Sequence, residues 1–375
     1  MKIDVFSPTI RRKEMDAVLT ALVEDKIGPG ERAQFLVQNA KEFLKFDYCL
    51  ALRSPAMALY IALKALDLRD GQGVVLSALS PRYYREVLKE LRLVPVYSDV
   101  EKGSPLIGRA GIEEAAARRK NVEVRCVLLC HSLGFLPDFH EIAELGLPVI
   151  EDRSHSFGST VNPVSVEGDS SGPGLPADVG EGRYGFSVYT ILGLEERDML
   201  TGGGGALLYA GNRRDGSVLR NFAGLPPEYG LPDMNAAMAV IQLRESARNL
   251  EKRREIADIY NQSALRTRHR RFVMGENLSY NNYAFPLILE TGLKDVKVYA
   301  RKKDILVEGA FARTLMGTLV ESGPGNSEAG REEGLDRENC PEAYSLSLRT
   351  IVFPLYPRLS SGEVEKISKL IITLP

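Results

Sequence analysis

Two runs, Val149-Ile150-Glu151-Asp152 and Thr201-Gly202-Gly203-Gly204-Gly205-Ala206-Leu207-Leu208, decide the fold of this chain. The first predicts a buried strand that ends in an acid, and the second predicts a tight glycine turn that leads into another apolar strand. Between them, residues 162–183 are rich in Gly, Pro and Ser and predict an extended loop, and residues 185–189 predict a short strand. This arrangement is typical of the floor of a cofactor site, yet no lysine occurs from Glu151 to Leu250.

Upstream of this floor, apolar strands alternate with helical segments. The expected strands are residues 48–52, 74–76, 94–97, 124–130 and 148–150, and a helix is expected between each consecutive pair. This alternation predicts a mainly parallel sheet with helices on both faces. Ligands of such sheets bind beyond the carboxyl ends of the strands, which makes these positions candidates for a site: Arg53, Ser54, residues 78–81, His131 and Asp152.

The pattern changes near Asn277. Residues 282–289 and 348–355 read as strands, and residues 296–306 and 362–370 read as helices. Strands and helices in this order predict a small α+β domain packed on the larger one. We therefore expect a large domain over residues 1–250 and a small C-terminal domain over residues 251–375.

Composition excludes several classes of function. The net charge of −2 gives no field that would attract nucleic acid or an anionic membrane, and four scattered cysteines indicate buried, reduced thiols and no metal site. No run of about 18 apolar residues is present, and the N-terminal residues lack the apolar segment of a secretory signal. These features favour a cytoplasmic protein.

Several motifs, in a fixed order, carry a resemblance to a known family. They are residues 27–30 (Ile-Gly-Pro-Gly), 53–59 (Arg-Ser-Pro-Ala-Met-Ala-Leu), 95–100 (Pro-Val-Tyr-Ser-Asp-Val), 131–134 (His-Ser-Leu-Gly), 150–155 (Ile-Glu-Asp-Arg-Ser-His), 201–206 and 353–357 (Phe-Pro-Leu-Tyr-Pro). By order and spacing together, the chain resembles the DegT/DnrJ/EryC1/StrS family of sugar aminotransferases from end to end. The resemblance implies the type I fold of pyridoxal-phosphate (PLP) enzymes, whose mainly parallel sheet has seven strands.

The resemblance also implies roles for particular residues. Asp152 matches the acid that keeps the pyridinium of PLP protonated, and His155 matches a residue beside the cofactor. Ser54 and Ser187 match residues on the phosphate side of the cofactor site. The family further implies a homodimer, because its site is built from two subunits, and a role with nucleotide sugars in the synthesis of surface polysaccharides.

The departures from the family pattern concern the cofactor itself. The lysine that forms the Schiff base is absent, and the nearest basic residue is Arg197, whose delocalised guanidinium is not a usable amine nucleophile. Pro55-Ala56 replaces a phosphate-binding Gly-Thr, and Pro81 stands where an aromatic ring would stack on the cofactor. Glu228 replaces an amide of the partner subunit.

Three interpretations follow. In the first, the chain is a degenerate member that binds a nucleotide sugar or another phosphorylated small molecule, or assists an active relative, without PLP. In the second, it is an active aminotransferase or dehydratase that binds PLP non-covalently or through an unrecognised lysine. In the third, acid–base chemistry without PLP uses the same cleft, with His131, Asp152, Arg153 and His155 as its candidate groups.

Overall fold

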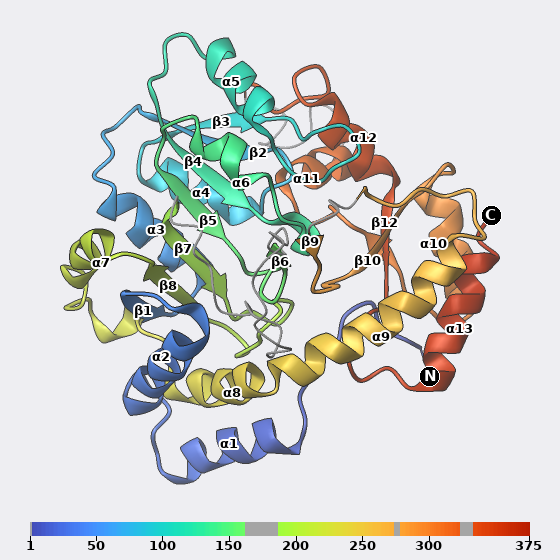
Figure 1. Ribbon diagram of the computed structural model, residues 1–375, viewed down its shortest axis with the longest axis horizontal. Coiled ribbons are helices and arrows are strands. Elements are labelled where there is room, and N and C mark those ends of the chain that lie inside the picture. The colour runs from blue at the N-terminus through green and yellow to red at the C-terminus, as the bar shows by residue number, and fades with distance from the viewer. Residues whose placement is uncertain (1, 162–186, 274–277, 323–332) are drawn as a thin grey trace, which may run out of the picture.

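A seven-stranded sheet forms the centre of the larger part of the molecule (Figure 1). We analysed a computed structural model that describes residues 2–161, 187–273, 278–322 and 333–375; the loop expected over residues 162–183 lies outside the described residues. In spatial order the strands are β1 (Tyr48–Leu52), β8 (Ala206–Ala210), β7 (Ser187–Gly193), β5 (Val149–Asp152), β4 (Val124–Cys130), β2 (Gly73–Ser77) and β3 (Val94–Ser98). Only β8 runs antiparallel to its neighbours in this sheet, which confirms the predicted mainly parallel sheet of seven strands.

Helices surround this sheet and connect its strands. They are α1 (Arg12–Val23), α2 (Glu31–Leu44), α3 (Pro55–Ala65), α4 (Arg82–Glu90), α5 (Arg109–Arg118), α6 (Phe139–Ala143), α7 (Arg213–Arg220) and α8 (Asp233–Arg244), with short 3-10 turns η1 (Ser132–Gly134) and η2 (Pro227–Tyr229). The sequence explains the start of α3, because the Ser54 hydroxyl accepts a hydrogen bond from the Met57 N–H and Pro55 occupies the first turn. The helix and strand pattern predicted for residues 48–152 is confirmed.

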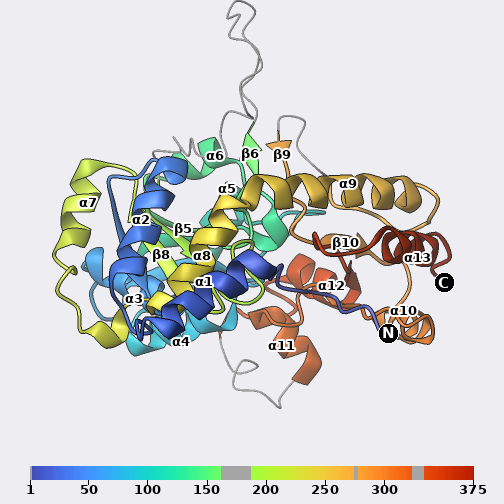
Figure 2. The same ribbon diagram turned by 90° about the horizontal axis from the view of Figure 1, so that it is seen from below.

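The C-terminal part builds a second, smaller sheet. Its strands are β10 (Phe285–Ile288), β12 (Thr350–Phe353) and β11 (Glu308–Gly309), and its helices are α10 (Leu293–Lys302), α11 (Leu315–Ser322), α12 (Pro341–Arg349) and α13 (Ser361–Ile372). A two-stranded ribbon, β6 (Thr160–Val161) with β9 (Leu278–Ser279), links the two parts of the chain. The helix α9 (Ser246–Ala264) runs from α8 to the small sheet, and both termini lie at the small-sheet end (Figures 1 and 2).

The apolar core is divided in the same way. One cluster of buried side chains surrounds the large sheet and also includes Met316 and Leu346 from α11 and α12. A second cluster joins α9, α10, α13 and the small sheet, and Ile3 from the N-terminal segment belongs to it. The domain boundary expected at residue 250 falls inside α9 and stays a prediction. In the described part of the chain, no helix combines the length and apolar character needed to span a bilayer.

Candidate functional site

The carboxyl ends of the parallel strands face the small sheet across a cavity of about 340 Å³. Strand β5 ends there at Asp152 and β4 is followed there by His131, while Glu308 of β11 and Val352 of β12 form the opposite wall. This edge is where a parallel sheet binds ligands, and the volume is within the range of small-molecule sites. The cavity is therefore the candidate functional site.

Asp152 is buried at the floor of this cavity and is saturated with hydrogen bonds. Its Oδ2 accepts from the hydroxyls of Tyr83, at 3.0 Å, and Tyr84, at 2.6 Å. Its Oδ1 accepts from the backbone N–H and the hydroxyl of Ser154, at 2.9 Å and 2.5 Å. A carboxylate offers about four lone-pair sites, so these donors use the whole acceptor capacity of Asp152.

The two tyrosines come from the first turn of α4. Their rings meet edge to face with centroids 4.9 Å apart. Burial raises the pKa of both phenols well above the ordinary value, and the charge of Asp152 raises it further, so both hydroxyls keep the proton that they donate. The sequence analysis gave no role to Tyr83 and Tyr84. The feature that could have pointed to the site is the occurrence of two adjacent tyrosines shortly after the end of a parallel strand.

Arg197 lies in the segment where the resemblance places a lysine. Its side chain contacts the small sheet and the N-terminal segment. Its guanidinium forms an ion pair with Glu308 of β11 and lies 4.6 Å from the centroid of the Phe6 ring. The three residues come from distant parts of the chain, and their contacts join the large sheet, the small sheet and the N-terminal segment. Arg197 therefore serves as a contact between the two parts of the molecule.

His155 and Asp198 stand together on the cavity wall. The His155 ring stacks on Tyr283, with centroids 4.1 Å apart and planes at 16°, and its Nε2 lies 3.9 Å from Oδ1 of Asp198. Burial lowers the pKa of His155 to about 4 and raises the pKa of Asp198 to about 7. Gly193 makes this packing feasible, because a Cβ there would lie 2.2 Å from Oδ2 of Asp198.

His131 lines the cavity and belongs to a buried network in its wall. Its Nδ1 lies 2.6 Å from the Ser156 hydroxyl, and its Nε2 lies 3.3 Å from Oε1 of Glu151. Burial lowers the pKa of His131 well below its ordinary value, with a contribution from Arg153, and burial raises the pKa of Glu151. At neutral pH His131 is an uncharged member of this network.

The two serines assigned to the phosphate side are not brought together with Asp152. Ser54 caps α3, and it is Pro55, which has no N–H to donate, that lines the cavity. Ser187 is the first residue of β7 and pairs with Val149, whereas Ile191 pairs with Asp152. Ser187 therefore starts its strand near the amino ends of the parallel strands, and its side chain forms a hydrogen bond with that of Glu151, the residue before Asp152.

The glycine turn uses its own amide groups. Gly203, Gly204 and Gly205 have positive φ, as the sequence predicted for a tight turn. The N–H groups of Gly202 and Gly204 donate to the carbonyl of Leu194, and that of Gly203 donates to the Thr201 hydroxyl. The amides of residues 202–204 are thus occupied within the turn.

Lysine is missing from the described residues that line the cavity. The segments 162–186, 274–277 and 323–332 contain no lysine in the sequence either. The described residues also contain no group of three or more His, Cys, Asp or Glu side chains that could hold a metal ion.

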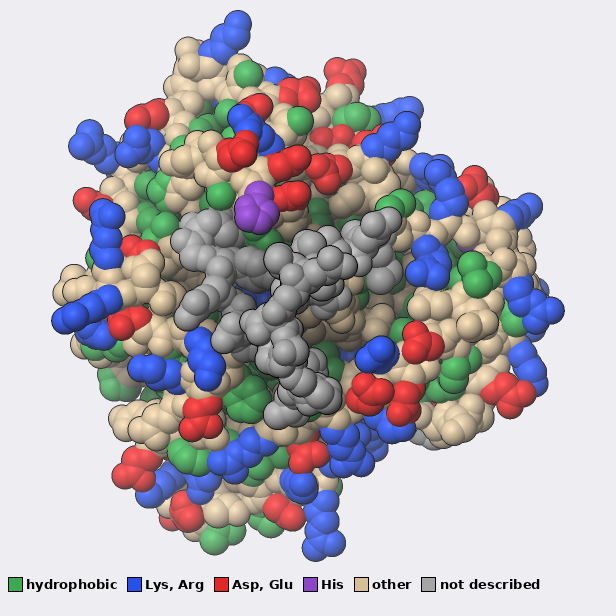
Figure 3. Space-filling model, viewed as in Figure 1, with side chains coloured by type: hydrophobic (Ala, Val, Ile, Leu, Met, Phe, Trp, Pro, Cys, Tyr) green, Lys and Arg blue, Asp and Glu red, His purple; other side chains and the backbone are tan. Residues whose placement is uncertain are grey.

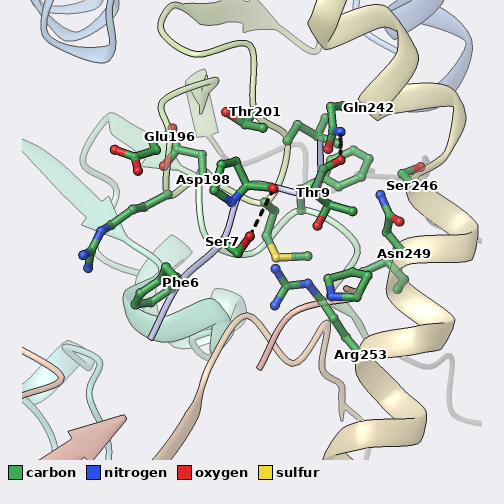
Figure 4. A pocket seen from close by; sticks show the side chains of 17 residues that line it. Phe6, Ser7, Thr9, Glu196, Asp198, Thr201, Gln242, Ser246, Asn249 and Arg253 are labelled. Atoms are coloured by element: carbon green, nitrogen blue, oxygen red, sulfur yellow. Dashed lines mark hydrogen bonds between the residues drawn. The ribbon is translucent and has the colours of Figure 1, made fainter. Parts of the chain in front are cut away.

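A second, much smaller cavity, shown in Figure 4, shares Phe6 and residues 196–198 with the lining of the first. Its volume is about 20 Å³, enough for a single water. Arg253 of α9 points toward it, and its Nη1 donates to the backbone carbonyls of Asn282, Tyr283 and Leu355. This cavity is a joint between the N-terminal segment, the loop and α9, and its size excludes an organic ligand.

Comparison with known proteins places this geometry in context. The model of the DegT/DnrJ/EryC1/StrS aminotransferase family matches residues 8–173 and 205–371. The match is interrupted over residues 174–204, the segment that contains Arg197 and Asp198. An uncharacterized protein of Methanocaldococcus jannaschii is 23% identical over 267 residues, which cover 68% of each chain.

Solved structures share the fold. The PLP form of a putative sugar aminotransferase from Streptococcus pneumoniae has a TM-score of 0.83 at 17% identity, covering 100% of this chain and 98% of that one. A GDP-4-keto-6-deoxymannose-3-dehydratase, solved with bound GDP-perosamine, has a TM-score of 0.77 at 15% identity and covers 98% of this chain and 100% of that one. At these identities the likeness establishes the type I fold of PLP-dependent enzymes for this chain.

Proposed function

Because the chain belongs to the DegT/DnrJ/EryC1/StrS aminotransferase family, we propose that it is a member that binds a sugar-derived ligand in the family's cleft without PLP-dependent transamination. Both halves of the chain match the family, and the interruption falls on the segment that would carry the Schiff-base lysine. The site residues around Asp152 support the same conclusion.

The hydrogen bonds of Asp152 carry the proposal. A PLP ring held in the family manner needs a carboxylate oxygen that is free to accept from the pyridinium N–H. Here the four donors from Tyr83, Tyr84 and Ser154 already occupy both oxygens of Asp152. The residues present therefore do not fit the cofactor, and no reaction step is assigned to it.

Two further features of the site argue against PLP binding. Arg197 has no usable amine and is paired with Glu308, and Pro55 removes an N–H from the helix start that would meet a phosphate. A charge-assisted hydrogen bond contributes roughly 1.5–3 kcal/mol, so the loss of several of them weakens binding of a phosphorylated cofactor by orders of magnitude.

The ligand and the partner are also part of the proposal. A dehydratase with the same fold has been solved with a nucleotide sugar, so we assign the cleft to the sugar end of such a molecule and the protein to nucleotide-sugar or surface-polysaccharide metabolism. The protein acts as a homodimer, and the exposed apolar side chains Met15, Leu19 and Leu22 of α1 support this assembly.

A titration with PLP tests the proposal. We expect no absorbance band of an internal aldimine and no adduct after borohydride reduction, either in the wild-type protein or in the Arg197→Lys variant, because Asp152 remains saturated in both. The Streptococcus pneumoniae aminotransferase, treated in parallel, provides the positive control.

An aldimine band together with a reducible adduct in the wild-type protein would establish the active PLP enzyme instead. Under the present proposal, Asp152→Asn leaves the response to PLP unchanged, whereas in a working PLP site the same substitution would weaken cofactor binding strongly.

A further inference from the structure

A buried arginine lies beside the small cavity of Figure 4 without a carboxylate to balance its charge. Arg253 is 8% exposed, and among the described residues no acid forms an ion pair with it. Its Nη1 donates to three backbone carbonyls, which are dipoles without net charge. Burial still lowers the pKa of Arg253 to about 10, so these dipoles do not fully offset the cost of burying the cation. A counter-ion beside the guanidinium would reduce that cost.

Asn249 lies one turn before Arg253 on α9, and Figure 4 shows both side chains directed toward the cavity. Asn249 is 9% exposed, and its Oδ1 has no hydrogen-bond partner in the described part of the chain. No contact of Oδ1 therefore holds the amide in one orientation, and its NH2 group is available as a donor. A buried polar group without a protein partner indicates that the group contacts a small occupant of the cavity.

Hydroxyl groups complete the polar lining. Thr9, Thr201 and Ser246 are all buried and come from the N-terminal segment, from the start of the glycine turn and from the first turn of α9. The Thr201 hydroxyl accepts from the N–H of Gly203 and keeps its own proton for donation. The lining thus combines a cation with neutral donor groups, and such a set favours a small anion.

Two acids also line this cavity, and neither balances Arg253 at mildly acidic pH. Glu196 is exposed, so solvent screens its charge. Burial raises the pKa of Asp198 to about 7, so this group is largely protonated at pH 6. Arg197, which lines the cavity as well, is already paired with Glu308. At pH 6 the unbalanced charge of the lining is therefore that of Arg253.

We propose that this cavity binds a single chloride-sized anion, held by Arg253 and Asn249. The volume of about 20 Å³ admits one occupant little larger than a water molecule and excludes sulfate, phosphate and carboxylates. A water would satisfy Asn249 but leave the charge of Arg253 unbalanced, whereas a halide ion contributes the opposite charge. Because Phe6 and residues 196–198 line both cavities, the anion would also stabilise one wall of the larger cavity.

Thermal unfolding in matched salts tests the proposal in solution. At pH 6, complete replacement of sodium gluconate by sodium chloride or sodium bromide should raise the Tm by about 2 °C, because the gluconate anion is too large to enter. Equal ionic strength keeps general screening the same in the three salts. At halide concentrations above the dissociation constant, the Tm should rise with the logarithm of the concentration, as binding to the folded state requires.

A pair of variants links the halide response to the cavity. Asn249→Asp places a carboxylate beside Arg253 in nearly the same shape, so the protein supplies its own counter-charge and the response should disappear. Gln262→Glu adds the same charge at an exposed position of the same helix and should keep the full response. Both variants retain Arg253 and its contacts with the three carbonyls.

A crystal grown in sodium bromide locates the anion directly. We expect an anomalous peak in the cavity, in contact with nitrogen atoms of Arg253 and Asn249. Equal Tm values in the three salts, a response that survives Asn249→Asp, a response lost in Gln262→Glu, or a cavity that holds only water in the bromide crystal would each overturn the inference. The PLP titration does not involve this cavity, so its result is independent of these outcomes.

Discussion

The hydroxyls of Tyr83 and Tyr84 hold Asp152 from one side, and Ser154 holds it from the other. Each of these bonds has a charged acceptor and is stronger than a bond between neutral groups. Ser154 extends the network, because its hydroxyl also accepts from the N–H of Gly193 at 2.8 Å. At the scale of single residues, the floor of the cavity is thus a structural cluster.

Removal of one hydroxyl from this cluster should destabilise the protein. We expect Tyr84→Phe to lower the free energy of unfolding by about 2 kcal/mol, because Asp152 stays buried and loses its 2.6 Å donor. Urea denaturation measures the change. Tyr299→Phe, which removes an exposed hydroxyl bonded to Thr373, is the matched control and should cost well under about 1 kcal/mol. Equal losses in both variants would contradict the structural role.

Asp198 and His155 should produce opposite dependences of stability on pH. The pKa of Asp198 is about 7 in the folded protein against 3.8 ordinarily, so the folded state retains a proton that the unfolded state has lost, and stability falls as pH rises through this window. The pKa of His155 is about 4 against 6.5, so the unfolded state binds the extra proton and stability rises with pH.

Single variants should separate the two effects. Relative to the wild-type protein, Asp198→Asn should gain stability as pH rises from about 4 to about 7, and His155→Gln should lose stability as pH rises from about 4 to about 6.5. Urea midpoints measured across this range give both slopes, and slopes of the same sign in the two variants would refute the assignment.

The sequence located part of this site, for identifiable reasons. Asp152 and His131 could be placed because strand ends are readable from a run of apolar residues followed by a polar one. The contacts of Tyr84 with Asp152 and of Arg197 with Glu308 join residues far apart in sequence, and no local pattern encodes them. Ser187 was assigned to the phosphate side of the site by its motif, but the strand register decides at which end of the parallel strands it lies.

At the scale of elements, α9 joins the two parts of the chain through a buried cation. Arg253 is buried, and burial lowers its pKa to about 10. The three carbonyls that it binds follow β9 and β12, so one guanidinium fixes α9 to two segments of the small part. The neighbouring Gln242 of α8 binds Glu14 and the carbonyl of Thr9 in a similar way.

Replacement of Arg253 should be costly. Arg253→Met leaves three carbonyls without their donor, and we expect a loss of about 3 kcal/mol in the free energy of unfolding. Arg254→Met changes the adjacent, exposed position of the same helix and should cost less than about 0.5 kcal/mol. Thermal and urea unfolding of both variants would check this difference.

The elements themselves were largely predictable. The strands from β1 to β5 and their intervening helices follow from apolar periodicity and from the Ser54-Pro55 helix start. The place of β8 between β1 and β7, antiparallel to both, depends on tertiary pairing. Ile3 belongs to the second core cluster, and an isolated β-bridge joins it to Ile305. This contact also depends on tertiary pairing between residues far apart in the sequence.

At the scale of the whole molecule, α1 exposes an apolar stripe. Met15, Leu19, Leu22 and Val23 share one side of the helix, and Leu19 and Val23 are 58% and 75% exposed. A groove of about 700 Å³ lies nearby between α2 and residues 222–231. By contrast, acidic and basic side chains are interspersed on the face shown in Figure 3. We propose that a second copy of the chain covers this apolar stripe.

Charges placed in this stripe should prevent assembly. We expect a dimer for the wild-type protein in size-exclusion chromatography with light scattering, and a monomer for Leu19→Glu with Leu22→Glu, because two buried carboxylates would face the partner. Val298→Glu, at an exposed apolar position of α10, should remain a dimer. A monomeric wild-type protein, or a dimeric double variant, would contradict the assignment of this face.

Helix α9 also connects the two parts of the molecule that form the walls of the cavity. It contains 19 residues, which corresponds to a length of about 28 Å. Its first turns contact the large part, its last turns belong to the core of the small part, and Arg253 fixes it between these ends. A helix held in this way ties the part of the chain that carries Asp152 to the part that carries Glu308, which lie on opposite walls of the cavity. A substitution in α9 could therefore alter the cavity although no residue of α9 is among its described lining residues.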